Sequence, residues 1–550
     1  MQIHHDAHTH IYQNLMDNEP NTYDQPPQSP EMMPMDSMMM GPMMPPPKRK
    51  KSWRDRVVKN FGRKKQQDLL TRSELIVPQW LVEKSVLFFF IAYAACRFAF
   101  GHPQPLDIIL VAFISVVLFF YASNQFSRNW ARQRERAFLH NVFIIGLAVR
   151  LIWIVYLYFF FNPKFFGSPL GSAEDTGWYI TFGKAIANWI SDGFPGSFNH
   201  LRLEYESAID DVGYPIWLAI IYLITFKSSD IFIPLVLKSI MGAYCAISIY
   251  RVTKRHFDVG TARMAALFCM LNPNLIYWCG TMMKETEMVF LCCLFLDKAD
   301  ATLSTSNKLG FRQLVPALLV GLALMFFRTV LGLVAFMAIF AHVVFVSHKV
   351  MSNGKKILAG VLVAATVFMG LGDRFISQSR EHLEQVESGG QQKNMEWRSE
   401  RKGGNSFAKY AGAAVFAPLI FTIPFPTFNR ANAEQIVQPI TSGGSYIRNV
   451  LSFFVILVMI LLVASGEWRK HVFILAYTCG YLLVLVLSGY AQSGRFHMPI
   501  WPMLMVFAAF GIQVAKDNKR VRRDYNLVLV AEIIACLGWN WFKLKGRGMI

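Results

Sequence analysis

Long apolar runs alternate with short polar connections along the chain, and this pattern predicts a membrane protein built of helices. Several runs approach the roughly 20 residues that a helix needs to cross a bilayer. We expect full crossings at 80–100, 106–124, 138–162, 231–250, 261–281, 286–300, 313–327, 329–347, 357–372, 446–466, 470–489 and 498–515, with a less regular run at 526–541 as a last candidate. The predicted fold class is therefore an all-α polytopic membrane protein with about 12 to 13 transmembrane helices.

Two apolar segments do not fit a full crossing. YPIWLAIIYLITF, residues 214–226, would reach only about 20 Å as a helix, against a hydrocarbon core of about 30 Å. AGAAVFAPLIFTIPFPTF, residues 411–428, contains three prolines, which interrupt helices. We expect both to be re-entrant segments packed inside protein, because irregular backbone at membrane depth must be shielded from lipid.

Basic residues cluster in the connections between apolar runs, and this distribution predicts the topology. The formal net charge is +19, but the clusters follow the positive-inside rule, so we expect a membrane partner and no nucleic acid. We expect the protein in the bacterial inner (plasma) membrane. The basic segment 48–65 would hold its N-terminus on the cytoplasmic side. The further connections expected on the inside are 127–138, 251–258, 297–313, 348–356, 466–470 and 516–524.

The same pattern divides the chain into five parts. They are a disordered Met-, Pro- and His-rich tail (1–47), a basic cytoplasmic segment (48–79), two additional N-terminal transmembrane helices (80–136), a transmembrane catalytic module (137–515) with outer loops at 163–212 and 372–410, and a basic loop with a C-terminal apolar segment (516–550). The outer loop 163–212 is expected to contain helices that lie beside the membrane.

This topology brings charged residues from separate segments to the outer face. Besides Asp175, they are Lys284, Glu285, Arg328, Arg495 and His497. Ionisable side chains at the membrane are expensive and usually face a cavity or a partner. We therefore expect a functional site at this end of the bundle.

The stretch GSAEDTGWYITFGKAIAN provides the first candidate. On a helix Asp175 and Tyr179 share a face, and Gly183 and Ala187 would let that face pack closely against the bundle. Asp175 could act as a general base or hold a divalent metal beside a phosphate. The alternative is that Glu174 and Asp175 only cap the helix start.

Two further positions follow apolar runs. Lys284 could bind a lipid phosphate while Glu285 orients it or binds a metal; alternatively, the lysine only extends to the interface. Arg328 lies between two apolar halves, where a turn would make it a phosphate ligand or, as the safer interpretation, an ion-pair partner.

The stretch SGYAQSGRFHMPIWPML contains the strongest cationic candidate. The planar guanidinium of Arg495 suits a phosphate, and His497 could add a donor or a metal ligand. A basic loop on the outside runs against the positive-inside bias. An anionic ligand supplies a reason for that exception.

Taken in order along the chain, these motifs resemble the GT-C superfamily of integral-membrane glycosyltransferases, which includes protein O-mannosyltransferases and lipid A aminoarabinose transferases. The matching residues are the D-x-x-x-Y stripe from Asp175 to Ala187, the G-Y-P helix from Gly213 to Tyr222, the NPNLIYW segment, and G-R-F-x-x-P-x-x-P from Gly494 to Pro502. The similarity covers roughly 138–515 and predicts a GT-C-like bundle with re-entrant segments and outer juxtamembrane helices.

This resemblance implies transfer of a sugar, with inversion, from a polyprenyl-phosphate donor to a glycan, lipid or protein acceptor at the outer face. Asp175 would be the catalytic or metal-binding carboxylate, with Glu174 as its substitute and Tyr179 and Glu285 in support. Arg495 would bind the donor phosphate. The chemistry of the residues themselves adds Lys284, Arg328 and His497 as phosphate ligands, although Lys284 beside Glu285 departs from the pattern of the family. A divalent metal ion held by Asp175 and Glu285 is the one cofactor this site would take.

Other classes of function remain alternatives. A lipid or lipid-linked-glycan transporter or flippase also uses broken helices and buried charge, although the sequence shows no convincing internal repeat. A lipid-linked oligosaccharide polymerase or ligase would need paired basic sites, which Arg374, Arg380, Arg398 and Arg401 could provide. A non-catalytic scaffold is the least favoured alternative.

Overall fold

The structure, a computed structural model, describes residues 76–168, 174–205, 211–226, 231–305, 311–346, 417–430, 441–488, 491, 493–516 and 518–550. These residues all belong to one unit, Ser52–Ile550. The tail 1–47, the basic segment 48–65, the crossing at 357–372, the loop 372–410 and its arginines lie outside the described residues, as does the side chain of Glu174.

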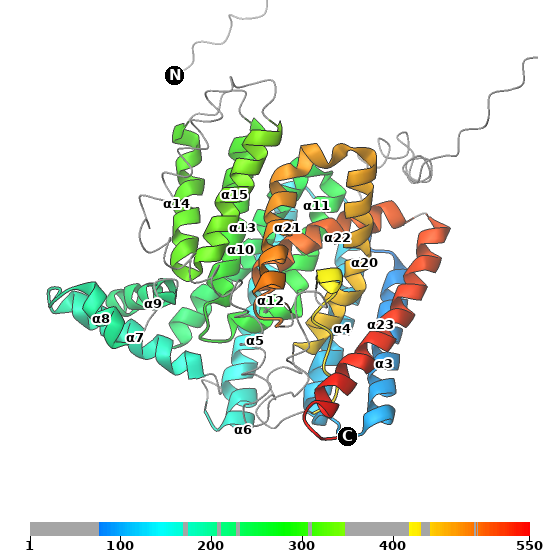
Figure 1. The fold of residues 1–550 in the computed structure, drawn as a ribbon, viewed down its shortest axis with the longest axis horizontal. Helices are drawn as coiled ribbons and strands as arrows, with labels where there is room; N and C mark the ends of the chain where they lie inside the picture. Colours follow the sequence, from blue (N-terminus) through cyan, green and yellow to red (C-terminus); the bar gives the residue numbers. More distant parts are fainter. Residues whose placement is uncertain are drawn as a thin grey trace, which may run out of the picture. The chain divides into compact units, whose positions relative to one another are not determined.

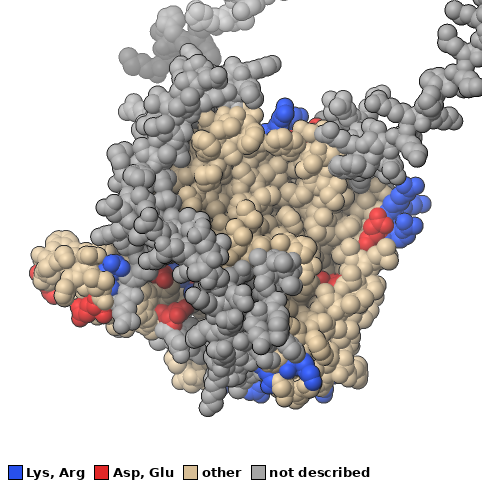
Figure 2. Space-filling model, in the orientation of Figure 1, with Lys and Arg blue, Asp and Glu red and all other residues tan. Residues whose placement is uncertain are grey.

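Eight of the described helices are long and apolar enough to cross a membrane, which confirms an all-α polytopic membrane protein. In the part of the chain that the structure describes, the only β-type pairing is an isolated bridge between Pro103 and Asn429. In the face drawn in Figure 2, apolar and neutral side chains cover most of the described surface, and charged side chains gather toward its margins.

The first three predicted crossings form helices close to their expected limits. They are α3 (Gln79–Phe100), α4 (Leu106–Asn129) and α5 (Glu135–Tyr156), the last continuing through a π-helical turn (Leu157–Phe161) into α6 (Asn162–Phe166). α4 packs against α3 and α11 (Val259–Leu271), and the C-terminal helix α23 (Lys519–Lys545) packs against α3. With 27 residues, α23 is long enough to cross, so the last candidate at 526–541 is part of a full-length helix.

The predicted outer loop contains short helices, α7 (Glu174–Ser191) and α8 (Phe198–Glu204), followed by α9 (Gly213–Ile224). α7 packs along α9, and Figure 1 shows α7, α8 and α9 grouped beside the longer helices. A Cβ added at Gly183 would lie 2.9 Å from Leu218 Cβ, so the small-residue stripe of α7 does allow a close approach. α9 has only twelve residues, about 18 Å, in agreement with the short helix predicted there.

The predicted crossing at 261–281 contains a break. The range 261–281 is not a single helix but two, α11 (Val259–Leu271) and α12 (Pro273–Cys279), separated at Asn272. The residue before a proline is pushed away from helical geometry, and Asn272 Oδ1 accepts the backbone N–H groups of Asn274 and Leu275 to begin a new helix. The sequence NPN contains both signals.

The remaining helices complete the bundle. They are α10 (Phe232–His256), α13 (Glu285–Thr305), α14 (Phe311–Phe327), α15 (Thr329–Val346), α20 (Ser442–Ser465), α21 (Val472–Leu487) and α22 (Trp501–Ala515), with short 3₁₀ turns at Glu467–His471 (η7) and Met498–Ile500 (η8). α10 packs on α5, α11 and α13, while α22 lies against α11 and α20. The Pro-rich segment enters the described residues at 417 and is a short 3₁₀ turn followed by irregular chain, not a crossing.

Candidate functional site

A single arginine joins two of the predicted site acids. Arg495, in the loop before η8, donates from Nη1 to Asp175 Oδ2 over 2.8 Å and from Nε to Glu285 Oε1. Glu285 begins α13 and is fully buried, whereas the Asp175 side chain at the start of α7 is 52% exposed. The guanidinium therefore has one anchored partner and one partner at the surface.

The surroundings of Arg495 keep it charged. Burial alone would disfavour a guanidinium ion, but Glu285 and Asp175 stabilise it and raise the pKa of Arg495 above its usual value. A second oxygen of Glu285, Oε2, is buried and has no hydrogen-bond partner among the described residues. The pair is thus a fixed cation held by a carboxylate that solvent does not reach.

A second ion pair lies beside the first. Lys284 Nζ donates to Asp211 Oδ1 and, over 3.0 Å, to the carbonyl oxygen of Phe327 at the end of α14. The Tyr179 hydroxyl also donates to Asp211 Oδ1, over 3.4 Å. Burial, with the nearby negative charge of Glu285, raises the pKa of Tyr179, so this hydroxyl stays protonated and remains a donor.

A third pair is completely buried. Lys238 Nζ in α10 lies 3.2 Å from Glu287 Oε2 in α13, donates to the carbonyl oxygen of Met283, and sits 5.0 Å from the ring centroid of Tyr214. Removing either partner would leave a buried charge without compensation. The three ion pairs therefore all involve residues at or just before the start of α13, namely Lys284, Glu285 and Glu287.

Arg328 does not form the ion pair that its sequence position suggested. The turn predicted between the apolar halves exists, since α14 ends at Phe327 and α15 begins at Thr329. The Arg328 guanidinium lies over the ring of Phe496, 4.3 Å from its centroid, a distance typical of a cation–π contact. Among the described residues, no carboxylate lies within ion-pairing distance of Arg328. Arg328 is therefore a second cation near Arg495, and it has no acidic partner in this part of the chain.

The two neighbouring ion pairs, Arg495 with Asp175 and Glu285 and Lys284 with Asp211, form what we call the Arg495 cluster. His497 is not part of it. Its side chain is fully buried, and its Nε2 lies 2.6 Å from the carbonyl oxygen of Ala491. Burial and the neighbouring Arg448 lower the pKa of His497 well below its usual value, so the ring is neutral. The predicted role as a phosphate donor or metal ligand at the outer face does not agree with this position.

Close backbone approach brings the elements of the site together. A Cβ added at Gly213 would lie 2.6 Å from Phe327 Cδ2 and 2.9 Å from the Phe326 carbonyl carbon, so only glycine fits between α9 and the end of α14. Asp211 precedes Gly213 by two residues and reaches Lys284 through this approach. The G-Y-P motif thus contributes a contact that positions the second ion pair.

An apolar cavity of about 420 Å³ opens beside the Arg495 cluster, between α9, α10, α13 and α14. Its walls include Gly213, Trp217, Ile220, Ala323 and Phe327. Glu287 also reaches this wall, so the third ion pair lies at the edge of the cavity. Phe327 connects the cavity to the ion pair of Lys284 and Asp211, because its carbonyl oxygen accepts from Lys284 while the residue also lines the cavity.

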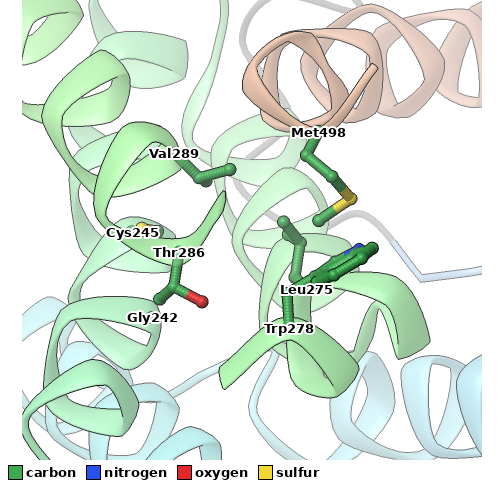
Figure 3. A pocket seen from close by; sticks show the side chains of 7 residues that line it. All are labelled: Gly242, Cys245, Leu275, Trp278, Thr286, Val289 and Met498. Carbon is green, nitrogen blue, oxygen red and sulfur yellow. The ribbon is translucent and has the colours of Figure 1, made fainter. Parts of the chain in front are cut away.

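A much smaller space lies deeper in the bundle. It has a volume of about 10 Å³, close to what one water molecule needs, and is lined among others by Trp278, Thr286 and Met498 (Figure 3). Thr286 follows Glu285 on α13, but this space is too small for any part of a lipid or a sugar. The larger apolar cavity is therefore the relevant one for a ligand.

The described side chains do not fit a metal centre. Within the described ranges, no group of three His, Cys, Asp or Glu residues is placed to hold a metal ion. Asp175 and Glu285, the two predicted ligands, both bind the guanidinium of Arg495. We therefore derive no chemistry through a metal.

Sequence reasoning missed three residues of the site: Asp211, Lys238 and Glu287. Lys238 stands alone within the apolar run of α10, and a single ionisable residue at such a position is by itself a signal of function or pairing. Asp211 directly precedes the G-Y-P motif, and Glu287 lies two residues after Glu285. Both could have been included as acids next to motifs already recognised.

The fold and site define a polytopic helical membrane protein with clustered ion pairs at one end of its bundle. No family model and no curated protein matches the sequence. Among solved structures, the chain is similar to the archaeal oligosaccharyltransferase AglB from Archaeoglobus fulgidus in complex with an inhibitory peptide and a dolichol-phosphate, at a TM-score of 0.41 and 14% identity, over 75% of this chain and 56% of that chain.

A second similar structure is an Archaeoglobus fulgidus oligosaccharyltransferase in complex with zinc and sulfate. Its TM-score is 0.38 and its identity 13%, over 73% of this chain and 53% of that chain. This chain thus spans little more than half the length of either oligosaccharyltransferase.

Proposed function

We propose that the protein is a GT-C-type membrane glycosyltransferase that moves a sugar from a polyprenyl-phosphate donor to an acceptor hydroxyl or amine. The observation that carries this proposal is the position of Arg495 between Asp175 and Glu285. It combines a fixed cation for a phosphate with a carboxylate that can take a proton. The motif order described above supports the same assignment.

The two carboxylates on Arg495 have different roles in this proposal. Glu285 is buried and holds Nε, so the orientation of the guanidinium persists when a ligand arrives. Asp175 is half exposed and holds Nη1, where a donor phosphate can replace it. Binding of the phosphate therefore releases Asp175 as a base at the moment it is needed.

The reaction then balances without a cofactor. The acceptor oxygen or nitrogen forms a bond to the anomeric carbon while its proton passes to Asp175. The bond from the anomeric carbon to the phosphate oxygen breaks, and its electron pair stays on the polyprenyl phosphate. Arg495 stabilises this developing charge, and Arg328 is a second cation without a carboxylate partner among the described residues.

The apolar cavity supplies a place for the lipid portion of such a donor. It is about 420 Å³ in volume, has an apolar surface, and lies next to the Arg495 cluster through Phe327. Lys284 is less suited to the phosphate than Arg495, because Asp211 and the Phe327 carbonyl already accept from it. We assign it to hold the segment before α9 in place.

The proposal is tested with the purified full-length protein in proteoliposomes that contain a labelled polyprenyl-phosphate sugar. Release of polyprenyl phosphate is measured, since it reports transfer to any acceptor. Asp175→Asn should lower the rate about 10² to 10⁴-fold and Arg495→Ala by at least about 10²-fold. Asp192→Asn, an exposed acid just after α7, is the matched control and should retain the wild-type rate.

Two results would overturn this assignment. Wild-type rates in both Asp175→Asn and Arg495→Ala would remove the site from the reaction. Movement of the labelled lipid between leaflets without any release of polyprenyl phosphate would instead establish a transporter. A further variant, Ala323→Phe, fills the apolar cavity and should impair long polyprenyl donors more than short ones.

A further inference from the structure

A second polar cluster lies at the opposite end of α13. Asp300 follows Glu285 by 15 residues on this helix, which places the two ends about 22 Å apart. Near Asp300 a cavity of about 160 Å³ is lined by Arg255 and His256 at the end of α10 and by Lys470 and His471 of η7. The topology predicted above puts these segments on the cytoplasmic side.

Arg255 is oriented by acids that lie behind it. Its Nε donates to Asp300 over 2.5 Å and its Nη2 to Asp297 over 2.8 Å, and both acids are almost fully buried. Arg255 itself is 23% exposed and lines the cavity. Its Nη1 donates to none of the described residues, which leaves part of a pre-oriented guanidinium available for a ligand.

The two histidines form a chain that ends at the cavity. His256 Nε2 lies 2.8 Å from Asp300 Oδ1, and His256 Nδ1 lies 3.1 Å from His471 Nδ1. The ring of His471 stacks on Phe257, with centroids 4.8 Å apart and planes inclined by 9°, and Phe257 stacks in turn on Phe510. Packing therefore fixes the His471 ring at the cavity wall.

The cavity wall carries two cationic side chains and one acidic side chain. Arg255 and Lys470 line it together with the two imidazoles, and the single acid in the wall is Glu467, whose carboxylate is 3.8 Å from Lys470. Asp297 and Asp300 lie behind Arg255 and do not line the cavity. Oriented guanidinium and imidazole donors around one space are the groups that bind a phosphate oxygen.

We propose that this cavity binds a phosphate group, either as inorganic phosphate or as the headgroup of an anionic phospholipid. Arg255 Nη1 and Lys470 contact the phosphate oxygens, and Phe257, Leu462 and Phe510 form the apolar part of the wall. The site is separate from the Arg495 cluster. It does not depend on the proposed glycosyltransferase reaction.

The contact between the two histidines also defines which atom of His471 can reach a phosphate. Its Nδ1 lies against His256 Nδ1, so a contact from this ring to a phosphate oxygen would come from Nε2.

The experiment uses the full-length protein in nanodiscs of phosphatidylcholine, with and without phosphatidylglycerol. The thermal midpoint is measured against inorganic phosphate concentration and against the phosphatidylglycerol content. Lys470→Gln and His471→Gln should each weaken binding about tenfold, as expected for loss of one charge-assisted contact. Arg469→Gln is the control, because this neighbouring base is exposed and does not line the cavity.

Each outcome decides the proposal. Stabilisation by inorganic phosphate in phosphatidylcholine identifies the free ion, and stabilisation only with phosphatidylglycerol identifies the lipid headgroup. Absence of both effects overturns the proposal, as does an equal loss in Arg469→Gln. Stabilisation by Zn²⁺ that His471→Gln abolishes, without any effect of phosphate, would also overturn it by showing a cation site. Lys470 is 73% exposed, so its variant should fold even if His471→Gln does not.

Discussion

The two ends of α13 show ion pairs of different construction. At the Glu285 end, the partners come from elements far apart in sequence, and two of the acids, Asp175 and Asp211, are 52% and 39% exposed. At the Asp300 end, the acids are at most 5% exposed and bind Arg255 of the adjacent helix α10. An exposed acid can be displaced from its cation by a ligand, whereas a buried acid orients its cation permanently.

The largest expected difference between the two ends is in stability. Asp300→Ala removes the buried acceptor of Arg255 Nε and of His256 Nε2, although Arg255 Nη2 keeps Asp297, and should lower the free energy of unfolding by about 3 to 5 kcal/mol. Asp175→Ala removes a half-exposed pair and should cost less than about 1 kcal/mol. Thermal or denaturant unfolding in the same detergent measures both. Equal losses would contradict the distinction between a displaceable and a permanent acid.

The next effect concerns the position of α7. Gly183→Ala places a Cβ 2.9 Å from Leu218 and 3.3 Å from the Pro215 carbonyl oxygen, so α7 must move away from α9. Overpacking of this kind should cost about 1 to 3 kcal/mol and shift Asp175 relative to Arg495, with a matching loss of transfer rate.

Gly177→Ala, in the same helix, provides the control for this effect. A Cβ added at Gly177 meets no atom within 4 Å, so stability and rate should stay near the wild-type values. If both alanine variants behaved alike, close packing of α7 on α9 would not be what positions Asp175.

A smaller, pH-dependent effect follows from His497. Its folded-state pKa lies well below the unfolded value, so the unfolded chain binds a proton that the folded protein excludes. Stability is therefore retained above about pH 6.5 and lost as the pH falls below it, with a limiting slope of about 1.4 kcal/mol per pH unit. His497→Gln should flatten this slope in thermal unfolding measured from pH 7.5 to 5. An unchanged slope would assign the acid sensitivity to another group.

The hydrophobic pattern predicted most helices because helix length and burial are encoded locally. The limits of α3, α10, α13, α14 and α15 lie close to the predicted crossings, and α9 is as short as expected. The break at Asn272 was missed, since the apolar run continues across it while a proline and a capping side chain divide the helix. The N-terminal tail and the loop 372–410 remain predictions.

The contacts of the candidate site could be anticipated only in part from the sequence. Sequence reasoning selected Asp175, Glu285 and Arg495, and in the structure Arg495 donates to both acids, while the functional roles of these residues remain predictions. It also selected His497, two residues from Arg495, although this ring points into the protein and is buried. Neighbouring residues on a loop can face opposite directions, and only their packing determines which one reaches the site.

The sequence by itself determined that this chain is a helical membrane protein with ionisable residues at the ends of its apolar segments, because hydropathy and helix length act over short stretches. Tertiary structure alone decided which charges meet. Asp175 and Arg495 are 320 positions apart, and Glu285 and Arg495 are 210 apart. Such pairs form only when helix packing and glycine contacts bring their backbones together, and that geometry depends on the whole bundle.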